Sequence, residues 1–387
     1  MYHFHNGSGG GVLSVIRNLL KYSQNPLIEN HVIYTINKDI VQNFIVPKLE
    51  GAVTEQIFYY SAGWNFYYTS KNLAKLLPDD KAIIIAHDWL ELGMVSNLGL
   101  QNKVVFFLHA NYDYYFNLAK SHTDAINKFI CVSNPIYNNL KEYLCERAQD
   151  ILQTYFPVAN VICSDRKNTI LNIFYGVRDL TENRKQFLII PEIDTFLRQA
   201  GVKVNWTVLG EGQEEFRVGR ALHSLQNLTY YSQLKNEEVL KQLCTHDIFV
   251  LPSLKEGLPV ALVEAMKAGL VPLISNWADA TSDLVKEREN GFYLNIGDAK
   301  GYAEAIAELN ANRELLQRMS EKAVVNANQY FDPYKNTEEI ESICIDAYTK
   351  EKKIKRAKKI YGSRLDYPLV PNFITQLIRK VVKHPKL

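Results

Sequence analysis

The sequence lacks long apolar runs, and its start lacks the pattern of a secretory signal. No stretch of the 387 residues approaches the roughly eighteen apolar residues of a membrane-spanning helix. The first residues, Met1 to Asn6, lead into a glycine cluster instead of a basic start and a long apolar segment. We therefore expect a chain that does not cross a bilayer and that stays in the cytoplasm.

Cysteine is also scarce. The chain has five cysteines, which are odd in number, widely spaced and nowhere arranged as Cys-x-x-Cys. This pattern favours neither a disulfide framework nor a zinc site, and we expect reduced, mostly buried thiols. The five residues are Cys131, Cys145, Cys163, Cys244 and Cys344.

Acidic residues are few at the C-terminal end, which sets it apart from the rest of the chain. From Lys350 to Leu387 there are twelve Lys or Arg residues and two acidic residues. The net charge of +2 therefore divides into +10 for this segment and −8 for residues 1–349. We expect the basic tail to be a separate electrostatic object.

Length and patterning predict two α/β domains. A chain of 387 residues exceeds the size at which a single core usually stops growing. In both halves short apolar runs alternate with helical periodicity, which is typical of doubly wound parallel sheets. We predict two Rossmann-like domains facing a central cleft. The expected strands are 31–36, 82–86, 104–108 and 129–132, then 169–175, 204–209, 228–231, 248–251 and 271–274.

The alternating pattern breaks at Phe156–Asn160, and we place the linker there. This gives an N-terminal domain of residues 1–160, a C-terminal domain of residues 161–345 and the basic tail of residues 346–387. The segments 303–309 and 315–327 are predicted to be the closing helices of the second domain.

Glycines and polar residues in the first domain stand just past predicted strands, where ligands of open α/β sheets bind. The loop Gly7–Gly11 directly precedes an apolar pattern of one buried helix face, which starts at Val12. His87 and Asp88 follow one predicted strand, and His109 follows the next. We expect the histidine and aspartate pair to shape a ligand cleft at this edge of the sheet.

The most informative stretch runs from Ser253 to Gly269 and joins a strand to a helix. Glu256 is predicted on the loop and Glu264 inside the helix, which starts near Pro259 and ends at Gly269. Because that helix is apolar almost all round, a carboxylate at Glu264 costs on the order of several kcal/mol without a hydrogen-bond donor. A ribose diol offers two donors, and the helix N-terminus suits a diphosphate.

The motif Glu-Gly-Leu-Pro-x-x-Leu-x-Glu-Ala-Met-x-x-Gly closely resembles the signature of family 4 glycosyltransferases, which have the GT-B fold. The resemblance covers roughly residues 1–345. It implies that Glu264 holds the ribose of a nucleotide-diphosphate sugar, that Glu256 lies by the transferred sugar, and that Gly257 and Leu258 contact the donor. Family members retain the anomeric configuration, and same-face attack requires no side-chain nucleophile.

The resemblance also implies that cations after Gly176 bind the donor diphosphate. The family shows Gly-Arg and then a Lys about six residues later, whereas here Arg178 comes one place late and Lys185 follows it by seven residues. The candidates are Arg178, Arg184 and Lys185, and the sequence leaves open which of them reach the phosphates. Fixed cations would stabilise the charge that the leaving nucleoside diphosphate gains.

Further positions match the family's pattern less closely. Gly210 and Leu234 match positions near the base and the donor pocket, but Ser232 replaces the usual glycine. The segment Asn276–Ala280 stands where many relatives have two glycines and an acid, so the donor-sugar contacts stay open there.

Two features of the first domain complete the resemblance. His109 resembles the histidine that many members place against the donor sugar. Gly10 and Gly11 resemble the glycine turn that approaches the donor and the acceptor.

The sequence also bears on four other functional classes. A dinucleotide-dependent oxidoreductase is disfavoured, because Val12 stands where the third Gly or Ala of the fingerprint belongs and no acid ends the strand at Ile36. A metal-dependent transferase of the other common architecture would need an Asp-x-Asp pair, which does not occur. A GT-B nucleotide-sugar epimerase and a non-catalytic nucleotide-sugar-binding subunit stay open, and product analysis and donor hydrolysis would separate them.

We therefore predict a metal-independent, retaining glycosyltransferase of the hexosyltransferase type, with no cofactor and no nucleic-acid partner. Its expected acceptor is a glycan or a lipid-linked molecule in surface polysaccharide synthesis. The tail segment Phe373–Lys383 is predicted to form a helix with one apolar face and one basic face. Two alternatives stay open for it: contact with the anionic inner face of the cytoplasmic membrane, or packing on the first domain. The apolar residues are Ile374, Leu377, Ile378 and Val381, and the basic ones are Arg379, Lys380 and Lys383.

Overall fold

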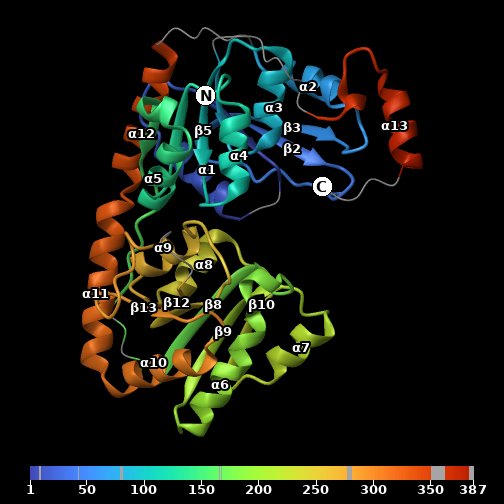
Figure 1. The fold of residues 1–387 in the computed structure, drawn as a ribbon. Helices are drawn as coiled ribbons and strands as arrows, with labels where there is room; N and C mark the ends of the chain where they lie inside the picture. The colour runs from blue at the N-terminus through green and yellow to red at the C-terminus, as the bar shows by residue number, and fades with distance from the viewer. Residues whose placement is uncertain are drawn as a thin grey trace. The chain divides into compact units, whose positions relative to one another are not determined.

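The chain divides into two compact units, each built on a parallel sheet (Figure 1). The computed structural model describes residues 1–7, 10–41, 43–78, 82–164, 166, 168–276, 281–349 and 362–382. The first unit comprises Met1–Pro157 and Tyr334–Leu387, and the second comprises Val158–Pro333. The first division falls inside Phe156–Asn160, the segment in which we expected the linker.

The sheet of the first unit has the strand order β3-β2-β1-β4-β5-β6-β7 over its described residues. Every neighbouring pair is parallel. The strands are β1 (Tyr2–His5), β2 (Asn30–Asn37), β3 (Ala52–Tyr60), β4 (Ile83–Ala86), β5 (Lys103–Leu108), β6 (Lys128–Cys131) and β7 (Ile151–Gln153). The helices are α1 (Gly11–Tyr22), α2 (Phe66–Ala74), α3 (Trp89–Leu98), α4 (Asp113–Ser121), α5 (Asn134–Tyr143), η1 (Cys145–Asp150), α12 (Pro333–Thr349), η4 (Arg364–Asp366) and α13 (Asn372–Val381).

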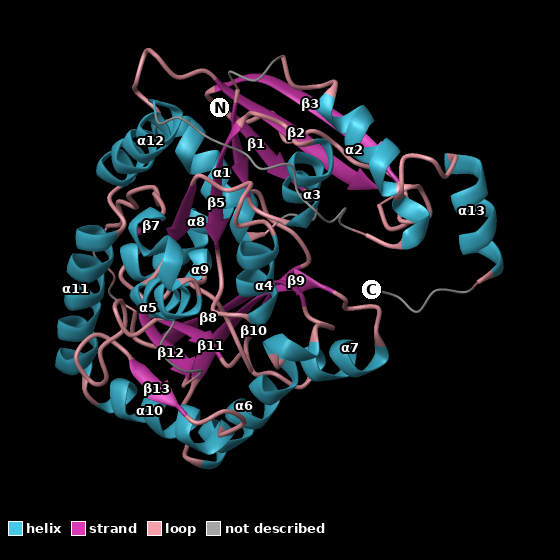
Figure 2. Cartoon of the chain, turned by 45° about the horizontal axis from the view of Figure 1, so that its top comes forward, coloured by secondary structure: helices cyan, strands magenta, loops and turns pink. Residues whose placement is uncertain are grey.

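The sheet of the second unit has the order β10-β9-β8-β11-β12-β13, again with parallel pairs in the described residues. Figure 2 shows the strands of each unit with helices around them. The strands are β8 (Leu171–Asp179), β9 (Val204–Glu211), β10 (Leu228–Tyr231), β11 (Ile248–Leu251), β12 (Val271–Ser275) and β13 (Phe292–Leu294). The helices are η2 (Asn183–Lys185), η3 (Phe187–Ile189), α6 (Ile190–Gln199), α7 (Phe216–His223), α8 (Asn236–Leu243), α9 (Val260–Lys267), α10 (Ala299–Ala311) and α11 (Arg313–Tyr330).

These observations confirm the prediction of two Rossmann-like α/β domains. Counted within each unit, both sheets contain the order 3-2-1-4-5-6, which is that of the dinucleotide-binding fold. The strands expected from apolar runs are present. In α1 the predicted apolar face is buried at Val15, Ile16, Leu19 and Leu20.

Four strands were not predicted, and each is short or polar. β1 alternates tyrosine, phenylalanine and two histidines, and β3 is an edge strand with exposed positions such as Val53. β7 and β13 are edge strands of three residues each. None of them is the continuous aliphatic run by which a buried parallel strand is recognised.

The C-terminal segment differs from the prediction, because the division places everything after Pro333 with the first unit. Two contacts made by α12 give the physical reason. Asp346 lies 3.3 Å from the ammonium of Lys128 at the start of β6. The Ser23 hydroxyl donates to Glu341. The tail therefore starts within an element that belongs to the first unit. The basic run Lys350–Lys359 lies outside the described residues.

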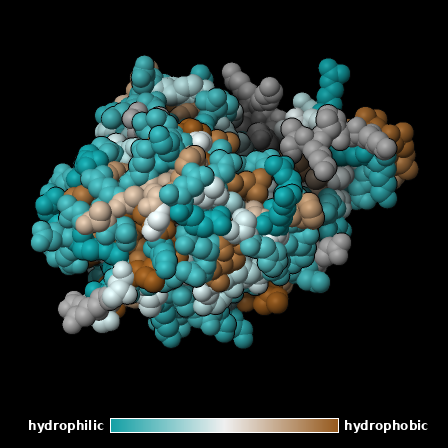
Figure 3. Space-filling view, turned by 90° about the horizontal axis from the view of Figure 1, so that it is seen from below, coloured by the Kyte–Doolittle hydropathy of each residue, from teal (hydrophilic) through white to brown (hydrophobic). Residues whose placement is uncertain are grey.

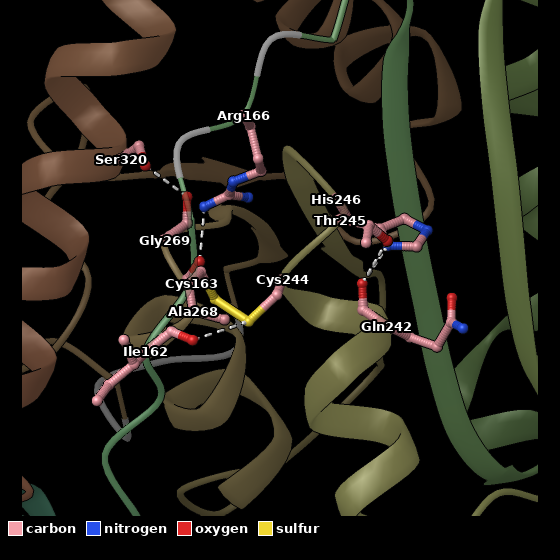
Figure 4. Close-up of a disulfide and its surroundings, with 10 residues drawn as sticks. All are labelled: Ile162, Cys163, Arg166, Gln242, Cys244, Thr245, His246, Ala268, Gly269 and Ser320. Carbon is pink, nitrogen blue, oxygen red and sulfur yellow. Dashed lines mark hydrogen bonds between the residues drawn. A yellow bond between two sulfur atoms is a disulfide. The ribbon is translucent and has the colours of Figure 1, made fainter.

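The expectation that all cysteines are reduced is wrong for one pair. Cys163 and Cys244 form a disulfide with Cα atoms 5.2 Å apart, although 81 residues separate them in sequence (Figure 4). The segment around Cys163 packs on the rest of the second unit, where Arg166 donates to the Ala268 carbonyl at 2.6 Å. No sequence pattern indicates that the segment after the linker lies close to the end of α8. Cys131 and Cys344 are buried free thiols, and Cys145 is exposed.

A buried lysine holds together the two segments at which the chain enters and leaves the second unit. Lys267, at the end of α9, is 2% exposed. Its ammonium donates to the Val158 carbonyl at 2.8 Å, to Asn160 Oδ1 at 2.9 Å and to the Phe331 carbonyl at 2.8 Å. Burial lowers the pKa of Lys267 to about 8.

Candidate functional site

Each sheet reverses its strand order at one point, and several of the predicted site residues follow the strands that meet there. In the second unit the reversal lies between β8 and β11, and in the first between β1 and β4. In open α/β sheets, ligands bind past the carboxyl ends of the strands at this switch point. Lys185 follows β8 and Glu256 follows β11, whereas Gly10 follows β1 and His87 follows β4.

In the second unit, Glu256 lies between two cations. Its Oε1 atom is 2.5 Å from the ammonium of Lys185, and its Oε2 atom is 3.2 Å from Nη1 of Arg184. The Glu256 side chain is 7% exposed, so this carboxylate is compensated by both partners. Arg184 also pairs with Glu182 at 2.8 Å. We call Glu182, Arg184, Lys185 and Glu256 the ion cluster, in which two positive charges meet two negative charges.

Backbone contacts hold the ion cluster in place. The buried Tyr175 hydroxyl donates to the Lys185 carbonyl at 3.1 Å, and the Leu254 N–H donates to the Arg184 carbonyl at 2.8 Å. Directly after Lys185, Gln186 adopts the left-handed conformation with φ of 50°. The Arg184 side chain donates to the Lys255 carbonyl at 3.2 Å. The turn after β8 and the loop after β11 are therefore joined through both main chain and side chains.

The helix α9 starts beside this loop, as the sequence predicted. Pro259 is the residue that precedes the first helical residue, Val260. The helix ends with Gly269 at φ of 81°, whose N–H donates to Met266, while the Leu270 N–H donates to Ala265. This is the Schellman arrangement that favours glycine. Glu264 lies within α9 and is half-buried, and Leu258 is 7% exposed.

Glycines shape the neighbouring strand ends. Gly210 has a φ of 156°, and a Cβ atom there would lie 2.9 Å from the Val177 carbonyl oxygen. The Tyr230 hydroxyl donates to the Gly210 carbonyl at 2.7 Å. Arg178 lies on β8 and is exposed.

Other predicted positions vary in exposure. Leu234 and Gly257 are half-buried, and Ser232 is exposed. Trp277–Ala280, part of the divergent segment, lies outside the described residues.

In the first unit, His87 and His109 form a hydrogen-bonded pair at the ends of β4 and β5. Nδ1 of His87 lies 2.8 Å from Nε2 of His109, so one of the two nitrogens carries the shared proton. Burial lowers the pKa of His109 to about 4. Burial and the neighbouring His109 hold the pKa of His87 well below its ordinary value. Both rings are therefore neutral near pH 7. Nε2 of His87 is buried and has no hydrogen-bond partner among the described residues.

The turn after His87 contains a buried carboxyl group that the sequence analysis missed. Glu91 is 1% exposed, and its Oε1 atom accepts the N–H groups of His87 at 2.6 Å and Asp88 at 2.7 Å. Burial, together with the nearby Asp88 carboxylate, raises the pKa of Glu91 to about 8. Asp88 caps α3 and accepts a hydrogen bond from the Tyr114 hydroxyl. The capping box Asp88-x-x-Glu91 was the available sequence signal.

A cavity of about 140 Å³ lies beside these residues in the first unit. Gly11 and Val12 at the start of α1 line it, together with His5, His87 and Tyr115. Gly10 has a φ of 97°, and no heavy atom would lie within 4 Å of a Cβ there. Ser8 and Gly9 of the predicted loop lie outside the described residues.

The described residues contain no group of three or more His, Cys, Asp or Glu side chains that could hold a metal ion. Nor is any described helix long and apolar enough to cross a membrane.

Comparison with known proteins points to sugar transfer. Residues 164–324 match the family model "Glycosyl transferases group 1". The chain is 32% identical over 144 residues to the amylovoran biosynthesis glycosyltransferase AmsK of Erwinia amylovora, covering 35% of each protein. It is 31% identical over 102 residues to the Escherichia coli UDP-Gal:alpha-D-GlcNAc-diphosphoundecaprenol alpha-1,3-galactosyltransferase, covering 26% of this chain and 25% of that one.

Solved structures agree in fold. HepE of Anabaena, in complex with UDP and glucose, superposes with a TM-score of 0.68 at 14% identity, covering 89% of this chain and 99% of that chain. At this identity the likeness shows a shared GT-B fold. The matches to the two curated relatives span about a third or less of their length. The comparisons therefore show a GT-B fold for the chain and a match of residues 164–324 to glycosyltransferases.

Proposed function

We propose that this chain is a retaining glycosyltransferase of family 4, which transfers a sugar from a nucleoside-diphosphate donor to a glycan or lipid-linked acceptor. The observation that carries the proposal is the ion cluster. It lies past the ends of β8 and β11, at the switch point of the sheet. All four of its residues fall within the segment 164–324 that matches the glycosyltransferase model.

The donor diphosphate would bind to the two cations of the ion cluster, Lys185 and Arg184. In the free protein, Lys185 and Arg184 are held by Glu256, so their positions are fixed before a ligand arrives. The diphosphate gains negative charge as its bond to the sugar breaks. The two cations therefore stabilise the transition state more than the bound donor. Arg178, exposed on β8, is a third candidate for the phosphates. These cations supply the charge compensation that a divalent ion gives in other transferases, and the proposed reaction needs no metal.

Glu264 would bind the ribose of the donor. It is a half-buried carboxylate on a helix whose other side chains are mostly buried and apolar. A vicinal diol donates two hydrogen bonds to one carboxylate and so compensates it. Gly257 and Leu258 lie in the loop that leads into α9, and we propose that they contact the donor as well. We propose uridine as the nucleoside, because HepE is described in complex with UDP and glucose.

In the first unit, His109 would contact the transferred sugar, and the cavity beside His87 would contribute to acceptor binding. Neutral imidazoles both donate and accept hydrogen bonds, which suits sugar hydroxyl groups. No side-chain nucleophile is proposed: the acceptor attacks from the face that the diphosphate leaves, and a phosphate oxygen takes its proton.

The names of two relatives support a proposal for the acceptor and the cellular site. One of them is described as acting on a diphosphoundecaprenol-linked sugar and another as an amylovoran biosynthesis enzyme. We propose surface polysaccharide synthesis at the inner face of the cytoplasmic membrane, which the basic tail contacts.

The test is product analysis with purified full-length protein in EDTA, using a panel of UDP-sugars and an undecaprenyl-diphosphate-linked sugar. We expect UDP release and a product with the anomeric configuration of the donor, measured by NMR. An inverted product would overturn the retaining mechanism. Interconversion of the donor sugar without transfer would instead show an epimerase. Binding without any turnover would show a non-catalytic subunit.

A further inference from the structure

The last described helix, α13, carries apolar side chains on its solvent side. Phe373 is 70% exposed, Leu377 65% and Val381 78%, at a spacing of four residues along one face. Leu369, just before the helix, is 93% exposed. We call these four residues the apolar ridge. Figure 3 shows hydrophobic side chains gathered at the end of the molecule that carries α13.

The opposite face of α13 is polar, and it is this face that packs on the first unit. Asn372 Oδ1 accepts the Asn65 N–H at 2.8 Å, and the fully buried Thr375 donates to the Leu365 carbonyl at 2.8 Å. Arg379 lies one turn further along and donates to Asp366 Oδ2 at 2.8 Å. A helix that docks on a domain usually turns its apolar face inward. In α13 the polar face points inward and the apolar face points to solvent.

The contacts of Arg379 fix this orientation. Its guanidinium also donates to the carbonyl oxygens of Trp64, at 2.5 Å, and Ala62, at 3.2 Å. Asp366 is 2% exposed and additionally accepts the Phe66 N–H at 2.6 Å. Because a buried ion pair and several main-chain groups depend on this arrangement, α13 cannot rotate to bury the apolar ridge without leaving them unpaired.

A cationic pocket adjoins the apolar ridge. A cavity of about 390 Å³ lies between α13 and the ends of β2 and β3, and Lys38, Trp64 and Lys380 are among the residues that line it. The ammonium of Lys38 lies 4.5 Å from the centre of the Trp64 ring. Tryptophan and lysine side chains are suited to the headgroup region of a bilayer, since both combine an apolar body with a polar end.

We infer that α13 is the element that binds an anionic lipid bilayer: the apolar ridge enters the boundary between headgroups and acyl chains, while Lys38 and Lys380 bind lipid phosphates. This deepens the membrane contact that the proposed function gives to the tail. Charge complementarity favours this partner, because residues 350–387 carry a net charge of +10. A second copy of the chain is a poorer fit, since the four side chains of the apolar ridge offer little against the roughly 1,000 Å² of a stable interface.

The experiment measures co-sedimentation of the full-length chain with vesicles, comparing phosphatidylcholine alone with an equal mixture of phosphatidylcholine and phosphatidylglycerol. The variant is Phe373→Ser with Leu377→Ser. Its matched control is Phe216→Ser with Val325→Ser, which removes similarly exposed apolar groups, 78% and 66% exposed, from α7 and α11. We expect the α13 variant to lose at least about tenfold in binding to the anionic vesicles and the control to lose none. Circular dichroism checks that both variants fold.

Insertion is tested by Phe373→Trp with brominated acyl chains. The added indole should be quenched in anionic vesicles, and Lys38→Gln with Lys380→Gln should weaken binding most at low salt. Three results would overturn the inference: no binding by the wild type, equal binding by the two apolar double variants, or concentration-dependent dimers lost in Phe373→Ser with Leu377→Ser without lipid quenching. Vesicle binding needs no nucleotide, so its failure would be distinct from failure of donor binding.

Discussion

The ammonium nitrogen of Lys185 lies 2.5 Å from Oε1 of Glu256, although 71 residues separate them in sequence. The contact joins the turn after β8 to the loop that precedes α9, at the switch point of the second sheet. A strong cation and a buried carboxylate are thereby set beside a helix N-terminus before any ligand binds. The predictions below follow from this arrangement and from three other ionisable side chains, Glu264, Glu91 and Lys267.

Lys185→Ala should lower the rate of sugar transfer by several-fold to thousands-fold, because the leaving diphosphate loses a fixed cation. Steady-state kinetics in EDTA measures this effect, and the exposed Lys241→Ala on α8 is the control. A chelator should leave the wild-type rate unchanged. Loss of transfer in EDTA, with rescue by a divalent ion, would refute the metal-independent reaction.

Glu264→Gln should weaken nucleotide binding by about 1 to 3 kcal/mol, the range of a hydrogen bond to a charged group, and should leave the fold intact. Isothermal titration with UDP checks it against Glu237→Gln, an exposed position on α8. Equal affinity in Glu264→Gln and the wild type would remove Glu264 from the ribose.

Glu91→Gln should change how stability depends on pH. The pKa of Glu91 is raised to about 8 in the folded chain from its ordinary value of 4.5. The folded state therefore binds more protons between these values, and the free energy of unfolding of the wild type falls as pH rises through this window. The amide does not titrate, so the variant should gain relative stability from pH 5 to pH 8.5.

Urea unfolding at these two pH values measures the difference between the variant and the wild type. Glu237→Gln, which is exposed, should show no such trend. A constant difference between Glu91→Gln and wild type across the window would mean that Glu91 is already ionised when buried.

Lys267→Met should destabilise the chain by about 1 to 3 kcal/mol, because the acceptors on Val158, Asn160 and Phe331 lose their shared donor. Thermal unfolding is compared with that of Lys322→Met on α11, where the lysine side chain is 50% exposed. Equal stability of the two variants would show that the three hydrogen bonds contribute little.

Sequence patterns predicted the parts of the fold that depend on local periodicity. The apolar runs that became β5, β6 and β11 were recognised because strands inside a parallel sheet are buried on both faces. The glycine at Gly269 marked the end of α9 because its left-handed conformation favours that residue.

What the sequence did not reveal depends on contacts between distant segments. Glu182 stands two residues from Arg184, but its role appears only when Glu256 is brought to the same guanidinium. The segment after the linker packs on the rest of the second unit. This packing brings Cys163 to Cys244 and the Val158 carbonyl to Lys267. The sequence predicted that α13 is amphipathic, with Ile374, Leu377, Ile378 and Val381 on one face. The most exposed apolar side chains of the helix are instead Phe373, Leu377 and Val381, because Arg379 turns inward to Asp366.

The central claim is that the second unit binds a nucleoside diphosphate sugar without a metal ion. The most direct test is a thermal unfolding titration of the full-length protein with UDP and UDP-sugars in EDTA, with uridine and inorganic phosphate as controls. A ligand at 100 times its Kd adds about 2.7 kcal/mol of stability by mass action. We predict a saturable rise in Tm with UDP or a UDP-sugar and none with uridine or phosphate. No rise with UDP, any UDP-sugar or any other nucleoside diphosphate sugar would contradict the account.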